Sequence, residues 1–160
     1  MNPGKSLENS LCIIPCGKDK SLRLGDPPKK AREAYSSPFF TKTLSYAEKF
    51  HPNSYRILST KYGLLRGNDE IEWYEEASFT EQAKDAIRKQ IFQQGLDNIG
   101  TIIALVSSQY FLSELKKFLP QKIFAPFQPF FHLGDRKWDP MIRAVQDRLS
   151  SGKPFDLPEE

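Results

Sequence analysis

The chain has 160 residues and a formal net charge of +3, a length that fits one domain and a charge too small by itself to indicate a nucleic-acid-binding protein. A hydrophobic content of 39% and a charged content of 27% are typical of a soluble globular protein, and a chain of this length can bury roughly 70% of its unfolded surface. No apolar run is long enough for a transmembrane helix, and the opening residues, MNPGKSLENS, lack the apolar segment of a signal peptide, so the sequence predicts a cytoplasmic protein without a membrane partner.

Segments with strand and helix patterns alternate along the chain. The predicted strands are short apolar runs at residues 11–15, 55–59, 101–107 and 122–127. The predicted helices follow these strands in turn, at residues 37–51, 78–96, 108–119 and 138–152. Residues 1–9 and 151–160 are expected to be loosely held ends, and the absence of a repeat or an interior linker predicts a single domain over residues 1–160.

Residues at the ends of the helical segments support these bounds. Ser37 is a suitable N-cap and Pro38 stands at the first helical position of its segment. Thr80 comes directly before Glu81 at the start of the next helix. Gly152 is a typical C-terminal stop for the last one.

The alternating order predicts the fold class. Strands that alternate with helices favour an α/β fold, here a single three-layer domain with a mostly parallel sheet of about four strands and helices on both faces. In such sheets ligands bind outside the carboxyl ends of the strands. The residues that follow each strand are therefore the first candidates for a site.

Polar and reactive side chains follow each predicted strand. The segments are CGKDK at 16–20, STKYG at 59–63, SSQY at 107–110, and HLGDRKW at 132–138 within the longer segment after the last strand. If the strands are parallel, these segments meet at one edge of the sheet. Lysines, hydroxyls, a thiol and glycines would then share that edge.

Simpler structural roles are also open for these residues. Lys18 could be a solvated loop charge, and Cys16 could be a small core residue. Gly17 and Gly63 could supply turns that need a positive φ, although Gly17 is also a place where a substrate could approach the backbone.

The remaining polar residues have similar alternatives. Ser107 and Ser108 are as well explained by capping the following helix as by binding a ligand. His132 stands between apolar residues and is expected to be packed or structural. Glu72 and Glu75 belong to an acidic segment, EIEWYEE, that could simply be a solvated loop.

The cysteines and histidines do not form a recognisable set. Cys12 and Cys16 are separated by an extended apolar segment, which places their α-carbons beyond disulfide range, so both are expected to be reduced. Two thiols and two distant histidines also fall short of a zinc site. The P-loop, dinucleotide-binding, H-E-x-x-H and G-x-S-x-G motifs are absent from the sequence, and no metal or cofactor is expected.

Four motifs in order resemble a known family. They are C-x-K-x-K after the first strand, A-x-x-A-Y-S-S-P-F-F, I-L-S-T-K-Y-G-L-L and E-I-E-W-Y. Over about residues 11–115 they resemble a small bacterial and phage domain family of unknown function, remotely similar to YaaA-type peroxide-stress proteins and to the core domain of archaeosine synthases. Thr60 stands where the family usually has Ala, and Trp73 where Pro is common. The resemblance implies a role in nucleic acid or nucleobase chemistry, and it points to Cys16, Lys18, Tyr35, Ser37, Ser59, Lys61, Tyr62, Gly63 and Tyr74.

The leading hypothesis is an enzyme that acts on a nucleobase, a nucleotide or nucleic acid, at a modified base or a glycosidic bond. Its catalytic candidates are Lys18, Lys61, Cys16 and Tyr35. Its substrate-binding candidates are Gly17, Ser37, Ser59, Tyr62, Gly63, Glu72, Tyr74, Ser107 and Ser108. Lys61 or Lys18 would act as nucleophile or electrostatic anchor, and Glu72 or Glu75 as general acid or base.

Two alternatives use the same residues differently. A non-catalytic nucleic-acid-binding module is suggested by basic residues beside aromatic ones at 115–118 and 135–138. A small-molecule or anion-binding protein is suggested by lysines and hydroxyls near predicted helix N-termini.

Overall fold

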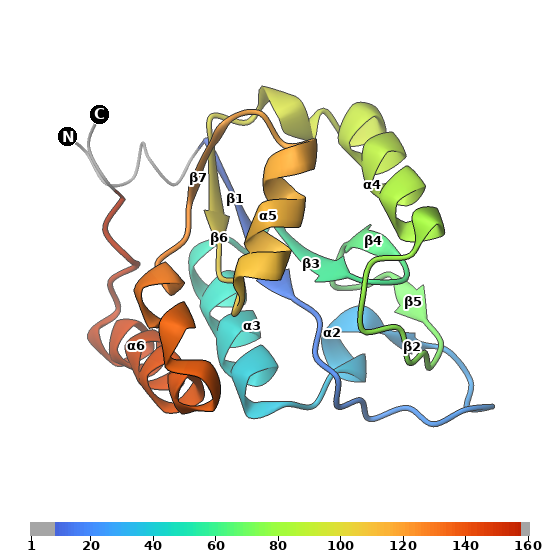
Figure 1. Ribbon diagram of the computed structural model, residues 1–160, viewed down its shortest axis with the longest axis horizontal. Helices are drawn as coiled ribbons and strands as arrows, with labels where there is room; N and C mark the ends of the chain where they lie inside the picture. The colour runs from blue at the N-terminus through green and yellow to red at the C-terminus, as the bar shows by residue number, and fades with distance from the viewer. Residues whose placement is uncertain (1–8, 158–160) are drawn as a thin grey trace.

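A mostly parallel sheet forms the centre of the protein, in a computed structural model that describes residues 9–157 (Figure 1). Within these residues the sheet has five strands in the order β4-β3-β1-β6-β7. β1, β3, β6 and β7 pair in parallel, whereas β4 is antiparallel to β3. The strands are β1 (Ser10–Pro15), β3 (Tyr55–Ser59), β4 (Gly63–Leu65), β6 (Thr101–Ala104) and β7 (Lys122–Phe124).

Helices cover both faces of this sheet (Figure 1). α3 (Pro38–Phe50) and α6 (Trp138–Ser151) pack on one face, and α4 (Glu81–Gln94) and α5 (Gln109–Phe118) on the other. The side chains of β1 alternate between these faces: Cys12 and Ile14 join the first core and Leu11 and Ile13 the second. An all-buried central strand of this kind explains the continuous apolar run in the sequence.

Shorter elements complete the fold. β2 (Lys29–Lys30) pairs antiparallel with β5 (Glu70–Ile71) in a small separate sheet. α2 (Ala31–Ala34) follows β2 directly. Two 3-10 segments, η1 (Leu96–Asn98) and η2 (Gln128–Lys137), precede β6 and α6.

The predicted α/β class, parallel sheet and helix starts are confirmed. Ser37 caps α3 by accepting a hydrogen bond from Phe40 N, with Pro38 in the first turn. Thr80 and Ser108 cap α4 and α5 in the same way. Gly152 ends α6 in the left-handed conformation.

Three strand predictions need correction. The sheet has a fifth strand within the described residues, because residues 63–65 fold back on β3 as β4 and do not continue a loop. The third strand ends at Ala104, before the predicted residue 107, and the fourth ends at Phe124, before residue 127. The β6–β7 ladder stops at the Ile103–Phe124 pair, so one side of β6 has no strand partner beyond that point.

The chain ends are also held more firmly than predicted, as far as they are described. The Phe155 backbone N–H donates to the Tyr46 hydroxyl at 2.8 Å, and the Phe155 ring packs on Tyr46 and Phe127. At the other end, the Asn9 side chain accepts a hydrogen bond from Gly100 N. Residues 1–8 and 158–160 lie outside the described residues.

Gly63 is expected to be essential for the β3–β4 hairpin. It has a φ of +81°, and a Cβ there would lie 2.7 Å from Gln90 Oε1 and 3.1 Å from Ile87 Cγ1. Gln90 Oε1 accepts from Leu64 N and its Nε2 donates to Tyr62 O, so the amide holds the hairpin against α4. We expect Gly63→Ala to lower the free energy of unfolding by about 2 kcal/mol, from backbone strain and displacement of Gln90 together.

Urea denaturation measures this effect, and Gly25→Ala is the matched control. Gly25 has a φ of +90° but no atom within 4 Å of a built Cβ among the described residues, so this variant incurs only the backbone term, about 1 kcal/mol. Equal losses in the two variants would show that the contact with Gln90 contributes nothing.

Candidate functional site

The strand order places a crevice between β1 and β6. The chain leaves β1 through α3 towards β3 on one side, and it leaves β6 through α5 towards β7 on the other. Because parallel crossovers share one hand, opposite directions put α3 and α5 on opposite faces of the sheet. The segments after β1 and β6 therefore separate, which is the point where α/β sheets bind ligands.

A pocket of about 1060 Å³ lies at this point. It is lined by the segment after β1, the starts of α3, α5 and α6, and the loop that precedes α4. Its residues are Pro15, Cys16, Gly17, Lys18, Asp19, Lys20, Ser37, Pro38, Phe39, Phe40, Thr60, Trp73, Tyr74, Glu75, Glu76, Ala77, Ser107, Ser108, Phe111, Lys137, Trp138, Asp139 and Ile142.

A buried hydroxyl network supports one wall of the pocket. The Tyr74 hydroxyl lies 2.5 Å from the Tyr35 hydroxyl and 2.9 Å from Ser59 Oγ. Ser59 Oγ also accepts hydrogen bonds from the backbone N–H groups of Lys61 and Tyr62. The exposed fractions of Tyr35 and Tyr74 are 4% and 3%. Burial raises the pKa of both phenols well above the ordinary value, so they remain neutral hydrogen-bonding groups at physiological pH.

Lys20 lies against this network. Its Nζ is 4.2 Å from the centroid of the Tyr74 ring and 5.8 Å from that of Tyr35. An antiparallel bridge between Lys20 and Tyr35, flanked by the Ser21 N to Ala34 O hydrogen bond, fixes the backbone there. Burial lowers the pKa of the Lys20 amine, an effect that its interactions with Cys16, Glu76, Asp19 and Glu75 only partly offset.

Cys16 joins the same cluster. The residue is half-buried, lines the pocket and interacts electrostatically with Lys20, Tyr35 and Tyr74. Cys12 is buried in the core, and both cysteines are free. A thiol, an amine and a phenol thus lie close together in the wall of the pocket.

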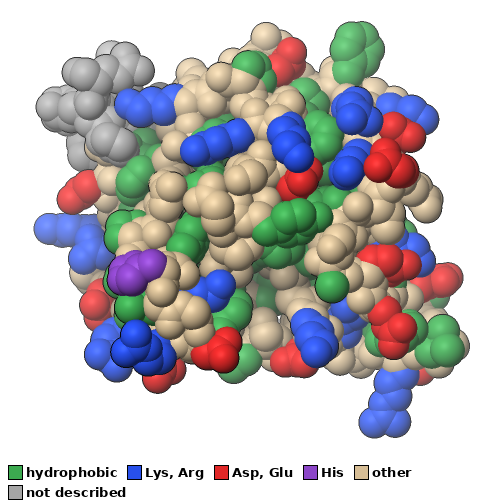
Figure 2. All heavy atoms as spheres, viewed as in Figure 1, with side chains coloured by type: hydrophobic (Ala, Val, Ile, Leu, Met, Phe, Trp, Pro, Cys, Tyr) green, Lys and Arg blue, Asp and Glu red, His purple; other side chains and the backbone are tan. Residues whose placement is uncertain are grey.

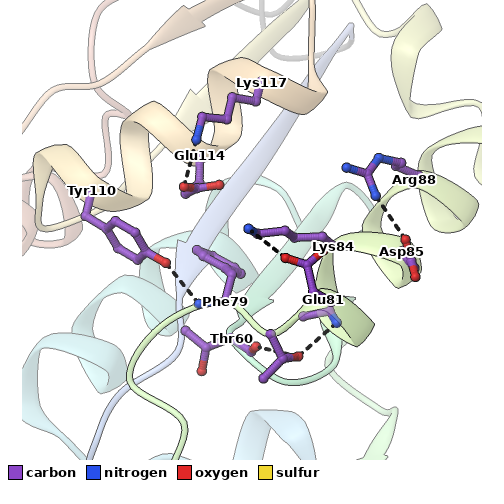
Figure 3. Close-up of polar contacts among 11 residues, drawn as sticks. Thr60, Phe79, Glu81, Lys84, Asp85, Arg88, Tyr110, Glu114 and Lys117 are labelled. Carbon is purple, nitrogen blue, oxygen red and sulfur yellow. Dashed lines mark hydrogen bonds and ion pairs between the residues drawn. The ribbon is translucent and has the colours of Figure 1, made fainter.

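The loop before α4 is anchored beside the pocket (Figure 3). Thr60 Oγ1 donates to Glu76 O at 2.5 Å, and Thr80 N donates to Thr60 O at 3.1 Å. Phe79 N donates to the Tyr110 hydroxyl at 2.9 Å, which joins the loop to α5. These contacts hold the loop that carries Trp73 to Ala77 over the ends of the strands.

The predicted site residues fall into three groups. Those that line the pocket are Cys16, Gly17, Lys18, Ser37, Tyr74, Ser107 and Ser108. Tyr35 and Ser59 lie behind it, bonded to Tyr74. The described residues that line the pocket do not include Lys61, Tyr62, Gly63 or Glu72.

The residues of this third group lie in the β3–β4 hairpin or contact it. Lys61 Nζ lies 5.4 Å from the centroid of the Tyr62 ring, and the Tyr62 hydroxyl accepts a hydrogen bond from Glu72 N. Gly63 begins β4 and faces α4. Lys18 and Lys61 therefore do not share the pocket.

Two other predictions are wrong. Gly17 is not among the described glycines with positive φ; its role is spatial, since a Cβ there would lie 3.0 Å from Ser37 Oγ. His132 is exposed on η2 and not packed.

Several pocket residues were missed by the sequence reasoning. Lys20 closes the C-x-K-x-K motif, so a signal was present, but the motif does not distinguish it from Lys18. The aromatic side chains of Phe39, Trp73 and Trp138 carry no comparable signal, because apolar residues at strand and helix ends usually belong to the core.

Residues 9–157 hold neither a candidate metal site nor a candidate membrane span. They contain no group of three or more His, Cys, Asp or Glu side chains placed to hold a metal ion. Their helices include none with the length and apolarity needed to cross a membrane.

The sequence is similar to those of other known proteins. A family model described as a family of unknown function, DUF6884, matches residues 11–137, which include the sheet and nearly all of the pocket. The uncharacterised protein YfjM of Bacillus subtilis (strain 168) is 33% identical over 107 residues, which cover 62% of this chain and 71% of that protein.

Proposed function

The chain belongs to the DUF6884 family of unknown function, and from the geometry of its pocket we propose that it is an enzyme acting on a nucleobase or nucleotide, with Lys20 as the catalytic amine. The observation that carries the proposal is the position of Lys20 in a pocket at the ends of the parallel strands, with its amine against the Tyr74 ring. A partly desolvated lysine has a larger fraction of neutral amine at physiological pH, and the neutral amine is the nucleophilic form.

The walls of the pocket suit a planar ring. Phe39 and Trp138 meet edge to face with their ring centroids 5.4 Å apart, and both line the pocket. Trp73 and Phe111 line it as well. Aromatic side chains recognise nucleobases by stacking, at about 1–3 kcal/mol for each base. The pocket volume is also close to the upper end of the usual range for small-molecule sites, roughly 300–1,000 Å³.

A small ligand fits the surface charge better than a long polymer. On the face in Figure 2, Lys and Arg side chains are interspersed with Asp and Glu side chains and do not form a single basic stripe. Of the two basic aromatic segments, Lys137 and Trp138 line the pocket, while Lys117 near the end of α5 pairs with Glu114. The proposal of a nucleobase as the substrate class also follows the remote resemblance of the sequence motifs to the core domain of archaeosine synthases.

The proposed reaction breaks a glycosidic bond. The neutral Lys20 amine forms a bond to the anomeric carbon, and the departing base takes the electron pair of the glycosidic bond together with a proton relayed by Glu75. Opening of the sugar ring moves the second amine proton to the ring oxygen and leaves an imine between Lys20 and the sugar. Water then hydrolyses the imine and regenerates the amine.

Borohydride trapping tests this proposal. The full chain is incubated with each common nucleoside 5′-monophosphate in turn, reduced with sodium borohydride and examined by intact-mass and peptide mass spectrometry. We expect a sugar-phosphate adduct on Lys20 with at least one of these nucleotides. In Lys20→Ala the adduct should decrease at least about tenfold, because Lys20 is the lysine that lies over the rings of Tyr35 and Tyr74 among residues 9–157.

Lys61→Ala is the matched control. Lys61 also lies near a tyrosine ring but is absent from the pocket lining in the described chain, so its loss should leave the adduct unchanged. An adduct of undiminished yield in Lys20→Ala, or no adduct with any nucleotide of the set, would contradict the proposed reaction.

A further inference from the structure

We infer that the pocket contains an oxyanion subsite for a phosphate monoester, formed by the N-termini of α3 and α5 and the hydroxyl of Ser107. The inference rests on the proposed function, because it concerns the same pocket, and it deepens that function by identifying the ligand as a nucleoside monophosphate. It concerns the part of the pocket that is formed by the starts of α3 and α5.

The first observation is that α3 and α5 both begin at the rim. Ser37 and Ser108 line the pocket, and the hydroxyl of each accepts one hydrogen bond from the first turn of its own helix, from Phe40 N at 3.1 Å and from Phe111 N at 3.4 Å. The other N–H groups of a first turn have no partner within the helix. These helices have 13 and 10 residues, long enough for a full dipole at their N-termini.

Neither α3 nor α5 has a carboxylate in its first turn that would neutralise the partial positive charge of its N-terminus. Acidic residues are favoured in the first turn because they neutralise the partial positive charge there. α3 and α5, which both lie within the described residues, have no acidic residue in that turn. In contrast, α6 begins at the same pocket and carries Asp139 in its first turn.

The second and independent observation is an unpaired hydroxyl. Ser107 has an exposed fraction of only 8%, and it lines the pocket directly before the N-cap of α5. Within residues 9–157 its hydroxyl has no hydrogen-bond partner and is not enclosed by protein, so its remaining exposed surface opens into the pocket. A hydroxyl that opens into the pocket and has no protein partner there is free to donate a hydrogen bond to a ligand oxygen.

Four carboxylates line the pocket besides these donors. Asp19, Glu75 and Glu76 all interact electrostatically with Lys20, and the fourth, Asp139, belongs to α6. Donors from two helices and a separate hydroxyl suit a tetrahedral group with three terminal oxygens, which is the geometry of a phosphate monoester.

Isothermal titration calorimetry at fixed ionic strength tests the subsite with three probes: a nucleoside, its 5′-monophosphate and inorganic phosphate. We use the nucleotide that gives the strongest adduct, or adenosine and AMP if none does. The monophosphate should bind at least about tenfold more tightly than the nucleoside, and inorganic phosphate should compete with it. Ser107→Asp should remove that preference, because it places a negative charge among the donors, while nucleoside binding stays within about twofold.

Ser107→Ala and Ser113→Asp complete the set. Ser107→Ala should weaken monophosphate binding by about three- to tenfold, through loss of one hydrogen bond. Ser113→Asp adds the same charge to α5 away from the pocket lining and should leave binding unchanged. Equal binding of nucleoside and monophosphate to the unmodified chain, or an undiminished preference in Ser107→Asp, would overturn the inference.

Different results would contradict the proposed reaction and the proposed phosphate subsite. Lys20→Ala should retain the preference for the monophosphate, because Lys20 is not one of the proposed donors of the subsite. A chain that prefers the monophosphate but forms no adduct would contradict only the reaction. A chain that forms the adduct equally well from nucleoside and monophosphate would contradict only the subsite.

Discussion

Replacing Tyr74 with alanine is expected to lower the free energy of unfolding by about 3–5 kcal/mol, the usual cost of removing a large buried aromatic side chain. The Tyr74 ring is 97% buried and packs edge to face with Tyr35 and Tyr62. Its hydroxyl joins Tyr35 to Ser59, so the substitution opens a cavity and also leaves polar groups without their partner. Urea denaturation at pH 7 measures the change.

Tyr74→Phe separates the hydroxyl from the ring. It keeps the packing but removes the Tyr74 partner of the buried Tyr35 hydroxyl, which should cost about 1–3 kcal/mol. Ser59 remains paired, because its oxygen still accepts from the N–H groups of Lys61 and Tyr62. In the double variant with Tyr35→Phe both phenol hydroxyls are absent, so it should be no less stable than Tyr74→Phe alone.

The two Tyr74 variants also differ in their expected effect on the site. Tyr74→Phe keeps the ring beneath Lys20 and should still form the borohydride adduct, whereas Tyr74→Ala should not. If the losses from Tyr35→Phe and Tyr74→Phe simply added in the double variant, the short contact between the hydroxyls would have no energetic meaning. Adduct formation in a folded Tyr74→Ala would show that the ring does not position the amine.

The strand-end rule located much of the pocket because it depends only on parallel topology. Cys16, Gly17 and Lys18 follow β1, and Ser107 and Ser108 follow β6, which is the neighbour of β1 in the sheet. The apolar runs and the alternation with helices were enough to predict that these strands are parallel. No knowledge of side-chain contacts was needed for this part of the site.

After β3 the same rule holds only for Thr60, because the chain reverses there. Residues 60–62 form the turn of a hairpin, and the register Ser59–Gly63 and Leu58–Leu64 turns a predicted loop into an antiparallel strand. A run of only two apolar residues after a glycine gives too weak a strand pattern to show this. Lys61 and Tyr62 therefore lie in the hairpin turn and do not line the pocket.

Lys20 shows a different limit of sequence reasoning. It was distinguished from Lys18 by a backbone bridge to Tyr35, fifteen positions away, and by the ring of Tyr74 from a distant loop. These are long-range contacts, and local pattern carries no information about them. The motif identified the right segment, and only the tertiary structure identified the right amine.

Acidification is expected to destabilise the protein through His51, by about 2 kcal/mol at pH 5 and about 3 kcal/mol near pH 4. His51 follows α3 with an exposed fraction of 1%, and neither ring nitrogen has a hydrogen-bond partner within the described residues. Burial lowers its pKa from 6.5 to about 4. The unfolded chain therefore binds a proton that the folded chain rejects, so stability is complete above pH 6.5 and is lost as the pH decreases towards 4.

The comparison of His51→Leu with His132→Gln isolates this effect from the titration of carboxylates. Urea denaturation at pH 7 and at pH 5 gives the loss of stability for each protein. In His51→Leu the loss should be smaller than in the unmodified chain by about 2 kcal/mol, because the group that binds the proton on unfolding is gone. His132→Gln should show the same loss as the unmodified chain, because His132 is exposed and the sequence contains only these two histidines. Equal losses in all three proteins would mean that the His51 imidazole is protonated in the folded chain, and that the pocket it occupies beside Tyr46 is open to water.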